Sequence, residues 1–249
     1  MKLLIIIPAF NEAESLKGVI EHLRSVCPNY DYIIVNDGST DETQAMCEKN
    51  NYNFINQPYN QGLAEAVRTG MKYALENGYD AALQFDADGQ HLPEYIDSMV
   101  EVMEQTDCDI VIASRFLTEK MPLRMRTVGG KMISAAIRKT VERNITDPTS
   151  GMRLYNSNII NAFLQNNILR PEPDTLTFLL RMGADIREVQ AKMEDRMNGQ
   201  SYLSPLNATK YMIRVLFSIL YAQKKWETID IKKQAETKKP KVLAESRGE

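Results

Sequence analysis

Short apolar runs alternate with amphipathic stretches along the first half of the chain. The runs are almost continuously apolar, as in strands buried on both faces of a sheet, and they lie at 3–7, 32–35, 81–85 and 110–113. Between them, apolar residues recur every three or four positions, which predicts helices at 12–25, 63–77 and 93–105. A weaker strand is expected at 52–56. This alternation predicts an α/β fold.

Polar segments begin where the predicted strands end. An order of strand, helix and strand implies a Rossmann-like, mostly parallel sheet with helices on both faces. Ligands bind such sheets beyond the carboxyl ends of the strands. The polar segments that start at those ends are 8–12, 36–39, 86–90 and 114–115. The sequence therefore predicts one binding site along this edge.

The second half of the chain has a different character. Residues 117–143 are rich in basic residues and methionine, and a helix is predicted at 128–141. After them we expect a loop at 147–153, two helical stretches, a short strand at 186–191 and an apolar helix at 206–226. The charged tail from Lys232 is expected to be disordered. We divide the chain into a domain at 1–200, an amphipathic helical extension at 201–230 and a tail at 231–249.

Composition excludes several classes of protein. The 249 residues carry a net charge of −3, which gives no support to bulk nucleic-acid binding. Three scattered cysteines fit neither a metal knuckle nor a disulfide framework, and we interpret them as buried or idle thiols in a reducing cytoplasm. The apolar start of the chain is too short for a signal peptide, and no apolar run is long enough for a transmembrane helix.

The pair Asp86 and Asp88 is the strongest candidate for metal binding. Two carboxylates at a strand end suit a hard divalent cation such as Mg²⁺ or Mn²⁺, which often bridges a substrate diphosphate. The pattern alone is weak, because Asp107-Cys108-Asp109 repeats it and is interpreted only as a turn. The alternative for Asp86 and Asp88 is a helix cap in a solvated turn.

Other polar residues at this edge allow two interpretations each. Asp37 is either a turn residue or an acceptor for a base N–H or a ribose hydroxyl. Glu12 either complements a helix dipole or contacts a ribose. Arg115 pairs with a surface acid or with a diphosphate. His91 is interpreted as a hydrogen-bonding residue rather than a base.

The apolar helix at 206–226 also has two interpretations. It could pack on the domain as a core helix. Alternatively it could lie at a membrane interface, with its cations facing lipid phosphates. Trp226 and the basic region at 120–143 favour the second interpretation.

Five ordered motifs, spread over residues 3–200, resemble the family 2 glycosyltransferases of the GT-A fold. More narrowly they resemble the dolichyl-phosphate mannose synthase and polyprenyl-phosphate glycosyltransferase branch. The main motifs are Ile-Pro-Ala-Phe-Asn-Glu at 7–12, Val-Asn-Asp-Gly-Ser-Thr-Asp-Glu-Thr at 35–43, Gln-Phe-Asp-Ala-Asp-Gly-Gln-His-Leu-Pro-Glu at 84–94, Ala-Ser-Arg-Phe at 113–116 and Asp-Pro-Thr-Ser-Gly-Met-Arg-Leu-Tyr at 147–155. The sequence departs from the branch in lacking the C-terminal transmembrane helices that many members carry.

The resemblance implies a role for each motif residue. The nucleotide sugar would be bound by Pro8, Phe10, Glu12, Asp37, Asp86 and Ala87. The metal, Mg²⁺ or Mn²⁺, would be held by Asp86, Asp88 and Gln90. Arg115 would neutralise phosphates. The acceptor side would be bordered by Asp147, Ser150, Gly151 and Arg153, with Asp147 as the base if one is needed.

The resemblance further implies an inverting, metal-dependent transfer of a hexose or N-acetylhexosamine for cell-envelope glycan synthesis. The donor would be a nucleotide sugar, by default UDP-linked, and the acceptor a polyprenyl phosphate. An ionised phosphate needs no general base but does need cations, which are Arg115, Arg124, Arg126, Lys131 and Arg153. The alternative acceptor is a hydroxyl of a lipid-linked cell-wall polysaccharide. We expect a cytoplasmic protein, peripheral at the membrane's inner face, that binds the membrane surface directly or through a small membrane-protein partner.

Overall fold

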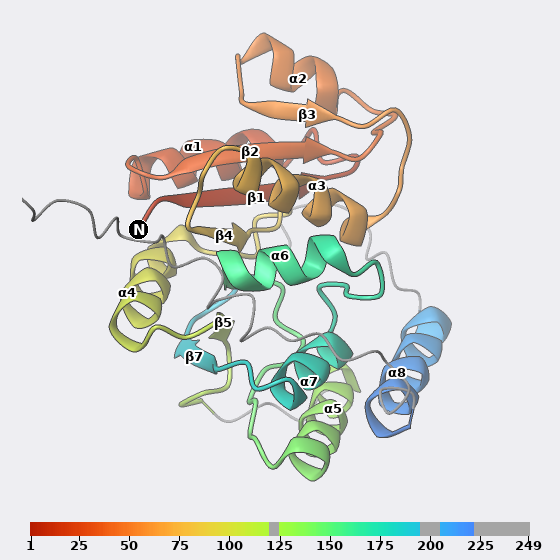
Figure 1. The fold of residues 1–249 in the computed structure, drawn as a ribbon. Coiled ribbons are helices and arrows are strands. Elements are labelled where there is room, and N and C mark those ends of the chain that lie inside the picture. Colours follow the sequence, from red (N-terminus) through yellow and green to blue (C-terminus); the bar gives the residue numbers. More distant parts are fainter. Residues whose placement is uncertain (120–124, 195–204, 222–249) are drawn as a thin grey trace, which may run out of the picture.

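The computed structural model describes residues 1–119, 125–194 and 205–221 (Figure 1). Within helices it does not describe the side chains of 125–127 and 205–209. The predictions for Arg124, Trp226 and the tail from Lys232 therefore lie outside the described residues, as do those for the side chain of Arg126 and the two ends of the proposed helical extension.

A seven-stranded sheet forms the centre of the molecule. The strands are β1 (Leu3–Ala9), β2 (Asp31–Asn36), β3 (Phe54–Asn56), β4 (Ala81–Gln84), β5 (Ile110–Ser114), β6 (Arg153–Asn156) and β7 (Ile186–Gln190). Their order across the sheet is β3-β2-β1-β4-β6-β5-β7. All pairs are parallel except those of β6, which runs antiparallel to both β4 and β5. The mostly parallel sheet predicted from the sequence is confirmed. No strand was predicted at β6, whose first residue, Arg153, was placed at the end of the loop 147–153.

The antiparallel strand β6 determines where the preceding loop lies. An antiparallel strand begins at the edge where its parallel neighbours end. Residues 146–152, which lead into β6, therefore lie beyond the carboxyl ends of β4 and β5. Among the described strands, β6 is also the sole link between the β3-β2-β1-β4 group and the β5-β7 pair.

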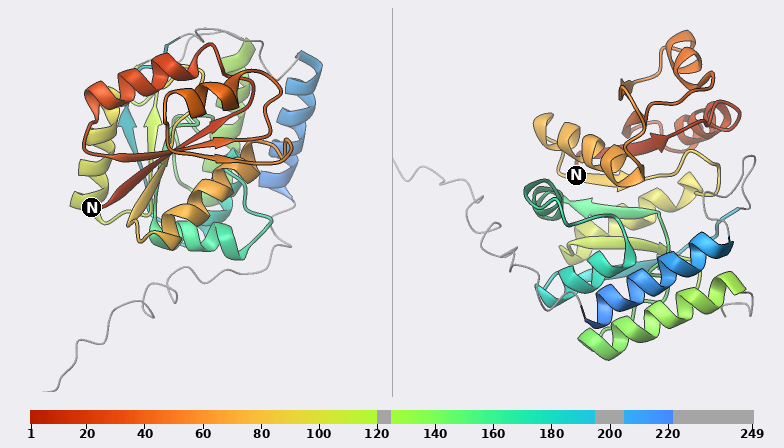
Figure 2. Two further views of the ribbon diagram at one scale, coloured as in Figure 1. Left: turned by 90° about the horizontal axis from the view of Figure 1, so that it is seen from above. Right: turned by 90° about the vertical axis from the view of Figure 1, so that its right-hand side faces the viewer.

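Helices cover both faces of the sheet (Figures 1 and 2). One face carries α3 (Leu63–Glu76), α5 (Met125–Val141), α6 (Ser157–Gln165), α7 (Pro173–Arg181) and α8 (Pro205–Leu220). The other carries α1 (Leu16–Val26), α2 (Thr43–Lys49) and α4 (Ile96–Thr106), which follows a short 3₁₀ turn, η1 (Pro93–Tyr95). Alternate residues of one strand supply the two faces, since Leu4 and Ile6 belong to the first core and Ile5 and Ile7 to the second. This alternation explains why β1 is apolar throughout.

Most predicted helices are present with shifted ends. Helix α1 begins at Leu16 rather than residue 12, because Glu12 and its neighbours belong to the loop after β1. Helix α5 begins at Met125 rather than 128. In the described part of the chain, no helix is both long and apolar enough to span a bilayer. Helix α8 packs against α5 and α7, with Val215 and Ile219 buried, so it contributes to the domain core.

Candidate functional site

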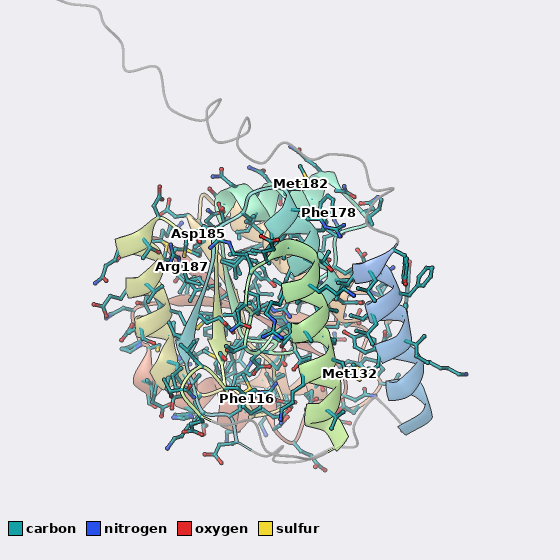
Figure 3. The ribbon with its side chains drawn as sticks, turned by 90° about the horizontal axis from the view of Figure 1, so that it is seen from below. Phe116, Met132, Phe178, Met182, Asp185 and Arg187 are labelled. Atoms are coloured by element: carbon teal, nitrogen blue, oxygen red, sulfur yellow. The ribbon has the colours of Figure 1, made fainter. Side chains whose placement is uncertain are left out.

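The polar loops predicted to converge do lie along one edge of the sheet. Figure 3 shows Phe116, just beyond the end of β5, far from Asp185 and Arg187, which mark the opposite end of the parallel neighbour β7. The loops after β1, β2, β4 and β5 lie at this carboxyl edge, and so does the loop before β6.

The loops after β1 and β2 are hydrogen-bonded to each other. The Asn11 N–H donates to Ser39 Oγ at 2.9 Å, and the Thr40 N–H donates to Asn11 Oδ1 at 2.8 Å. Asn11 has a φ of 56°, a left-handed conformation that asparagine tolerates better than most residues. Glu12 accepts from Ser15 Oγ at 2.7 Å. Pro8, predicted to bind the donor, is buried within β1.

Asp37 joins the loop after β2 to the start of α3. Its two carboxylate oxygens accept from the N–H groups of Gln61 and Gly62, each at 2.8 Å, and the side chain is 3% exposed. These are N–H groups at a helix amino terminus, which otherwise have no intrahelical acceptor. These bonds connect the loop after β2 to a distant part of the chain rather than closing a local turn, and each ionised oxygen can accept a further hydrogen bond.

The loop after β4 holds Asp86 in a fixed orientation. Its backbone N–H donates to His91 Nδ1 at 2.9 Å, and its Oδ1 accepts from Gln84 Nε2 at 3.3 Å. Because Nδ1 is an acceptor, the proton of a neutral His91 is on Nε2, which lies 3.6 Å from Asp86 Oδ2. His91 is therefore a hydrogen-bonding residue that supports Asp86, in line with its interpretation from the sequence.

Asp88 and Gln90 form the second part of the same loop. Asp88 is 3% exposed, and its Oδ1 accepts from the Gln90 N–H at 3.0 Å. Gln90 is bonded to the segment after β7, since its carbonyl accepts from the Glu194 N–H and its Nε2 donates to the Glu194 carbonyl at 3.3 Å. Phe10 and Ala87, the other predicted donor-site residues, lie in the loops after β1 and β4.

The loop at 86–90, called the acidic loop from here on, fits a hard divalent cation that is bound jointly by the protein and by a substrate. Within the described ranges, no cluster of three or more His, Cys, Asp or Glu side chains is arranged to bind a metal. Asp86 and Asp88 offer oxygen donors, and Mg²⁺ in proteins commonly binds through one or two carboxylates, with substrate phosphates and water completing the shell. The carboxylate of Asp86 is 31% exposed and thus accessible to such a ligand.

Gly151 brings the loop before β6 into contact with the acidic loop. A Cβ atom at this position would lie 2.9 Å from Asp86 Oδ2 and 3.4 Å from His91 Cε1. The Gly151 backbone therefore lies directly against the carboxylate, and a side chain at this position would push the two apart.

Arg115 and Asp147 form an ion pair at the other end of this loop. Arg115 Nε and an Nη donate to the two oxygens of Asp147 at 2.7 and 2.9 Å, and the same Nη donates to Thr149 Oγ1 at 3.1 Å. Asp147 is fully buried, whereas the Arg115 side chain is 35% exposed. A buried carboxylate with a bidentate partner is not presented to an acceptor hydroxyl. The geometry therefore favours Asp147 as a partner of Arg115 over the base considered from the sequence.

Arg153 has a different place from the one predicted. It is 2% exposed, and its guanidinium donates to the carbonyls of Ser150 at 2.8 Å and Pro148 at 2.7 Å. These bonds bury the charge of Arg153 beneath the loop, and its contact with substrate phosphates stays a prediction. Arg153 shapes the loop that carries Asp147 and Gly151.

A cation-lined cavity lies beside the Arg115–Asp147 pair, and most of its lining was missed by the sequence analysis. Its volume is about 220 Å³, and it is lined by Phe116, Lys131, Ser134, Ala135, Arg138, Asn144, Ile145 and Thr146. Lys131 and Arg138 are exposed at the surface of α5. The Ser134 Oγ is buried and has no hydrogen-bond partner within the described residues. The spacing Lys131, Ser134, Arg138 along one helix face was the available signal.

Comparison with known proteins identifies the family of the chain. The family model "Glycosyl transferase family 2" matches residues 4–164. An undecaprenyl-phosphate mannosyltransferase of Micrococcus luteus is 30% identical over 82% of this chain and 88% of its own length. A UDP-N-acetylglucosamine–dolichyl-phosphate N-acetylglucosaminyltransferase of Methanococcus voltae is 33% identical over 64% and 70%.

A solved structure shares the fold. Glucosyl-3-phosphoglycerate synthase of Mycobacterium tuberculosis, crystallised with Mn²⁺, UDP and glucosyl-3-phosphoglycerate, superposes with a TM-score of 0.65. It is 18% identical, and the match covers 89% of this chain and 79% of that one.

Proposed function

The chain belongs to glycosyl transferase family 2 and is a glycosyltransferase, and from this premise we propose that it transfers a sugar from a nucleotide sugar to a polyprenyl phosphate. The observation that carries the proposal is the cation-lined cavity beside Arg115, which suits a phosphate monoester. Two relatives, an undecaprenyl-phosphate mannosyltransferase and a dolichyl-phosphate N-acetylglucosaminyltransferase, support the same acceptor class.

The donor side of the proposal rests on the loops after β1, β2 and β4. The nucleoside would bind near Glu12 and Asp37, and the diphosphate near Asp86 and Asp88. A divalent cation held by Asp86 and Asp88 would stabilise the negative charge that develops on the leaving diphosphate. The mycobacterial structure contains Mn²⁺ and UDP, which supports a divalent metal and a uridine nucleotide as the first ligands to test.

The acceptor side rests on cations rather than on a base. A phosphate monoester has a second pKa of about 6, so it is largely dianionic at pH 7 and already nucleophilic. Its oxygen would attack the anomeric carbon opposite the nucleoside diphosphate, so that the carbon–oxygen bond to the diphosphate breaks and the configuration inverts. Arg115, Lys131 and Ser134 would bind the remaining phosphate oxygens. The buried pairing of Asp147 with Arg115 favours this mechanism over one that needs a base.

Exposed apolar side chains favour a lipid surface near this acceptor site. Ile213 and Phe217 of α8 and Tyr221, the residue directly after the helix, are 60% to 64% exposed at four-residue spacing, which places them on one face. Met132 on α5 is 52% exposed, and α5 packs beside α8 (Figure 3). We therefore propose peripheral binding to the cytoplasmic face of the membrane.

A product assay tests the proposed function. The purified protein is incubated with UDP-glucose, UDP-N-acetylglucosamine, GDP-mannose or dTDP-rhamnose, with Mg²⁺ or Mn²⁺, and with or without undecaprenyl phosphate in detergent. We expect mass spectrometry of the organic phase to find one polyprenyl-phosphoryl sugar. Metal-dependent hydrolysis of a donor without any lipid product would contradict the proposed acceptor.

Two lysines of α5 provide a matched test of the cavity. Lys131 lines it, and Lys139 is exposed on the same helix outside it. We expect Lys131→Met to raise the KM for undecaprenyl phosphate about tenfold, since a charged hydrogen bond contributes about 1.5–3 kcal/mol, and Lys139→Met to leave it unchanged. Equal effects would show that only the net charge of α5 matters.

The hydroxyl acceptor is the second candidate, and Asp147 distinguishes the two. A hydroxyl must lose its proton, so Asp147→Asn would abolish transfer while sparing donor binding if Asp147 were the base. With a phosphate acceptor, the same variant loses only part of its activity, because Arg115 keeps its charge but loses an ionised partner.

A further inference from the structure

Strand β7 contributes a carboxylate to the loop that carries Asp147. Glu188, half-buried on β7, accepts from the Thr146 N–H at 2.8 Å, from Thr146 Oγ1 at 2.8 Å and from the Asp147 N–H at 3.0 Å. Three donors from two consecutive residues thus converge on one side chain. The sequence analysis assigned no role to Glu188, although a charged residue inside a predicted strand was a usable signal.

The hydroxyls next to this carboxylate form a chain with a defined direction. An ionised carboxylate only accepts, so the Thr146 hydroxyl proton points to Glu188. Ser114 Oγ lies 2.6 Å from Thr146 Oγ1 and must then be the donor of that bond. Ser114 Oγ in turn accepts from the Phe116 N–H at 3.2 Å. This series of hydrogen bonds runs from the Phe116 N–H to the Glu188 carboxylate and passes around Arg115.

A second residue of β7 holds the other side of Arg115. Gln190 lies two positions after Glu188, on the same face of the strand. Its Nε2 donates to the Arg115 carbonyl at 3.2 Å, and its Oε1 accepts from the Thr118 N–H at 2.7 Å. β7 therefore fixes both the backbone of Arg115 and, through Glu188, the backbone of its carboxylate partner Asp147.

We propose that Glu188 is a positioning residue for the acceptor phosphate, acting through Asp147 on the guanidinium of Arg115. This inference rests on the proposed function, in which Arg115 binds that phosphate. Without the Glu188 carboxylate, the N–H groups of Thr146 and Asp147 lose their acceptor, and the loop must rearrange to hydrate them. That rearrangement moves Asp147 and, with it, the guanidinium.

The variant Glu188→Gln tests the proposal with little change in volume. Its amide keeps one acceptor oxygen but turns an NH₂ group toward N–H and O–H donors. We expect the KM for undecaprenyl phosphate and the Kd for heptaprenyl monophosphate, measured by calorimetry, to rise about tenfold, with kcat and the Kd for UDP in Mn²⁺ changed less than about threefold. Glu101→Gln, the same change at an exposed position of α4, should leave all four values unaltered.

A double-mutant cycle separates this mechanism from general destabilisation. If Glu188 acts through Arg115, Glu188→Gln adds nothing to the Kd for heptaprenyl monophosphate in an Arg115→Ala background. An equal effect in both backgrounds, or a Glu188→Gln variant identical to Glu101→Gln, would overturn the inference. If Arg115→Ala itself leaves that Kd unchanged, the proposed acceptor site is wrong, and the inference falls with it.

A milder variant carries the test if Glu188→Gln does not fold. Thr146→Ala removes the hydroxyl between Ser114 and Glu188 but keeps the backbone N–H. It should raise the Kd for heptaprenyl monophosphate about threefold in the wild-type background and not in Arg115→Ala. The matched control is Thr140→Ala on α5, whose hydroxyl donates only to the Ala136 carbonyl at 2.7 Å. A Thr146→Ala variant that behaves like Thr140→Ala would refute the role of the hydrogen bonds between Ser114, Thr146 and Glu188.

Discussion

Replacing Gly151 by alanine should weaken metal binding more than it weakens the fold. Its φ lies outside the left-handed region, so the backbone itself accepts alanine. The added Cβ would lie 2.9 Å from Asp86 Oδ2. Ordinary contact of a carbon with a heavy atom needs about 3.5 Å, so the two must separate by roughly half an ångström.

The structure indicates which group moves. The new Cβ would contact the carboxylate of Asp86, which is 31% exposed and can rotate without disturbing the core. We therefore expect a loss of stability of about 1 kcal/mol, at the low end for overpacking. The displaced oxygen is a proposed metal ligand. Disturbing the support of a ligand typically costs about 10–100-fold in metal affinity, and we expect about tenfold here.

The assay is a titration of Mn²⁺ in the presence of UDP, followed by electron paramagnetic resonance, together with a thermal melt. Gly18→Ala is the matched control, because nothing lies within 4 Å of its new Cβ and alanine favours helix α1. It should leave Mn²⁺ affinity unchanged and the Tm equal or slightly higher. A Gly151→Ala protein with wild-type Mn²⁺ affinity would refute the reasoning, whatever its Tm.

Two further predictions concern the surface and the thiols. Ile213→Asp with Phe217→Asp should reduce cosedimentation with phosphatidylglycerol vesicles about tenfold or more at unchanged Tm, since both side chains are already exposed. The control is Ile168→Asp, because Ile168 is also exposed, at 52%, but lies between α6 and α7, and an equal loss would contradict an α8 surface. Burial raises the pKa of the Cys27 and Cys47 thiols to about 11, so at pH 8 only about one in a thousand is ionised. Native protein should therefore react with Ellman's reagent only after denaturation, and rapid reaction at pH 8 would contradict the buried thiols.

The sequence predicts the parts of this structure that depend on local pattern. The apolar runs of β1, β2, β4 and β5 and the polar residues after them identify the sheet and its binding edge, because burial on both faces requires continuous apolar sequence. The strand β6, Arg-Leu-Tyr-Asn, was missed because it is short and its buried Arg153 makes it appear polar. Its pairing with β4 and β5 depends on residues distant in sequence.

The candidate site also has one part that follows from local sequence and another that depends on contacts between distant residues. The acidic loop at 86–90 is recognisable because its residues are contiguous. The Arg115–Asp147 pair and the support from Glu188 join segments that are far apart in the chain, so spacing alone could not reveal them. For the cavity around Ser134, spacing along α5 indicates one wall, but not Phe116 or Thr146, which complete the lining from other segments. The same limit applies to Arg153, because its sequence gives no sign that backbone carbonyls bury its charge.

The position of β6 has a consequence for how the protein assembles during synthesis. The ribosome completes β1 to β5 before β6 exists, yet within the described sheet β4 and β5 are joined only through that later strand. The pairing of Ala81 with Asn156 closes a long loop, which is a slow, entropically costly step. The carboxylates of the acidic loop and the Arg115 guanidinium therefore stay on separate parts of the nascent chain until the four residues of β6 align them. Mutations in β6 should delay the gain of activity during refolding more than they lower the final activity.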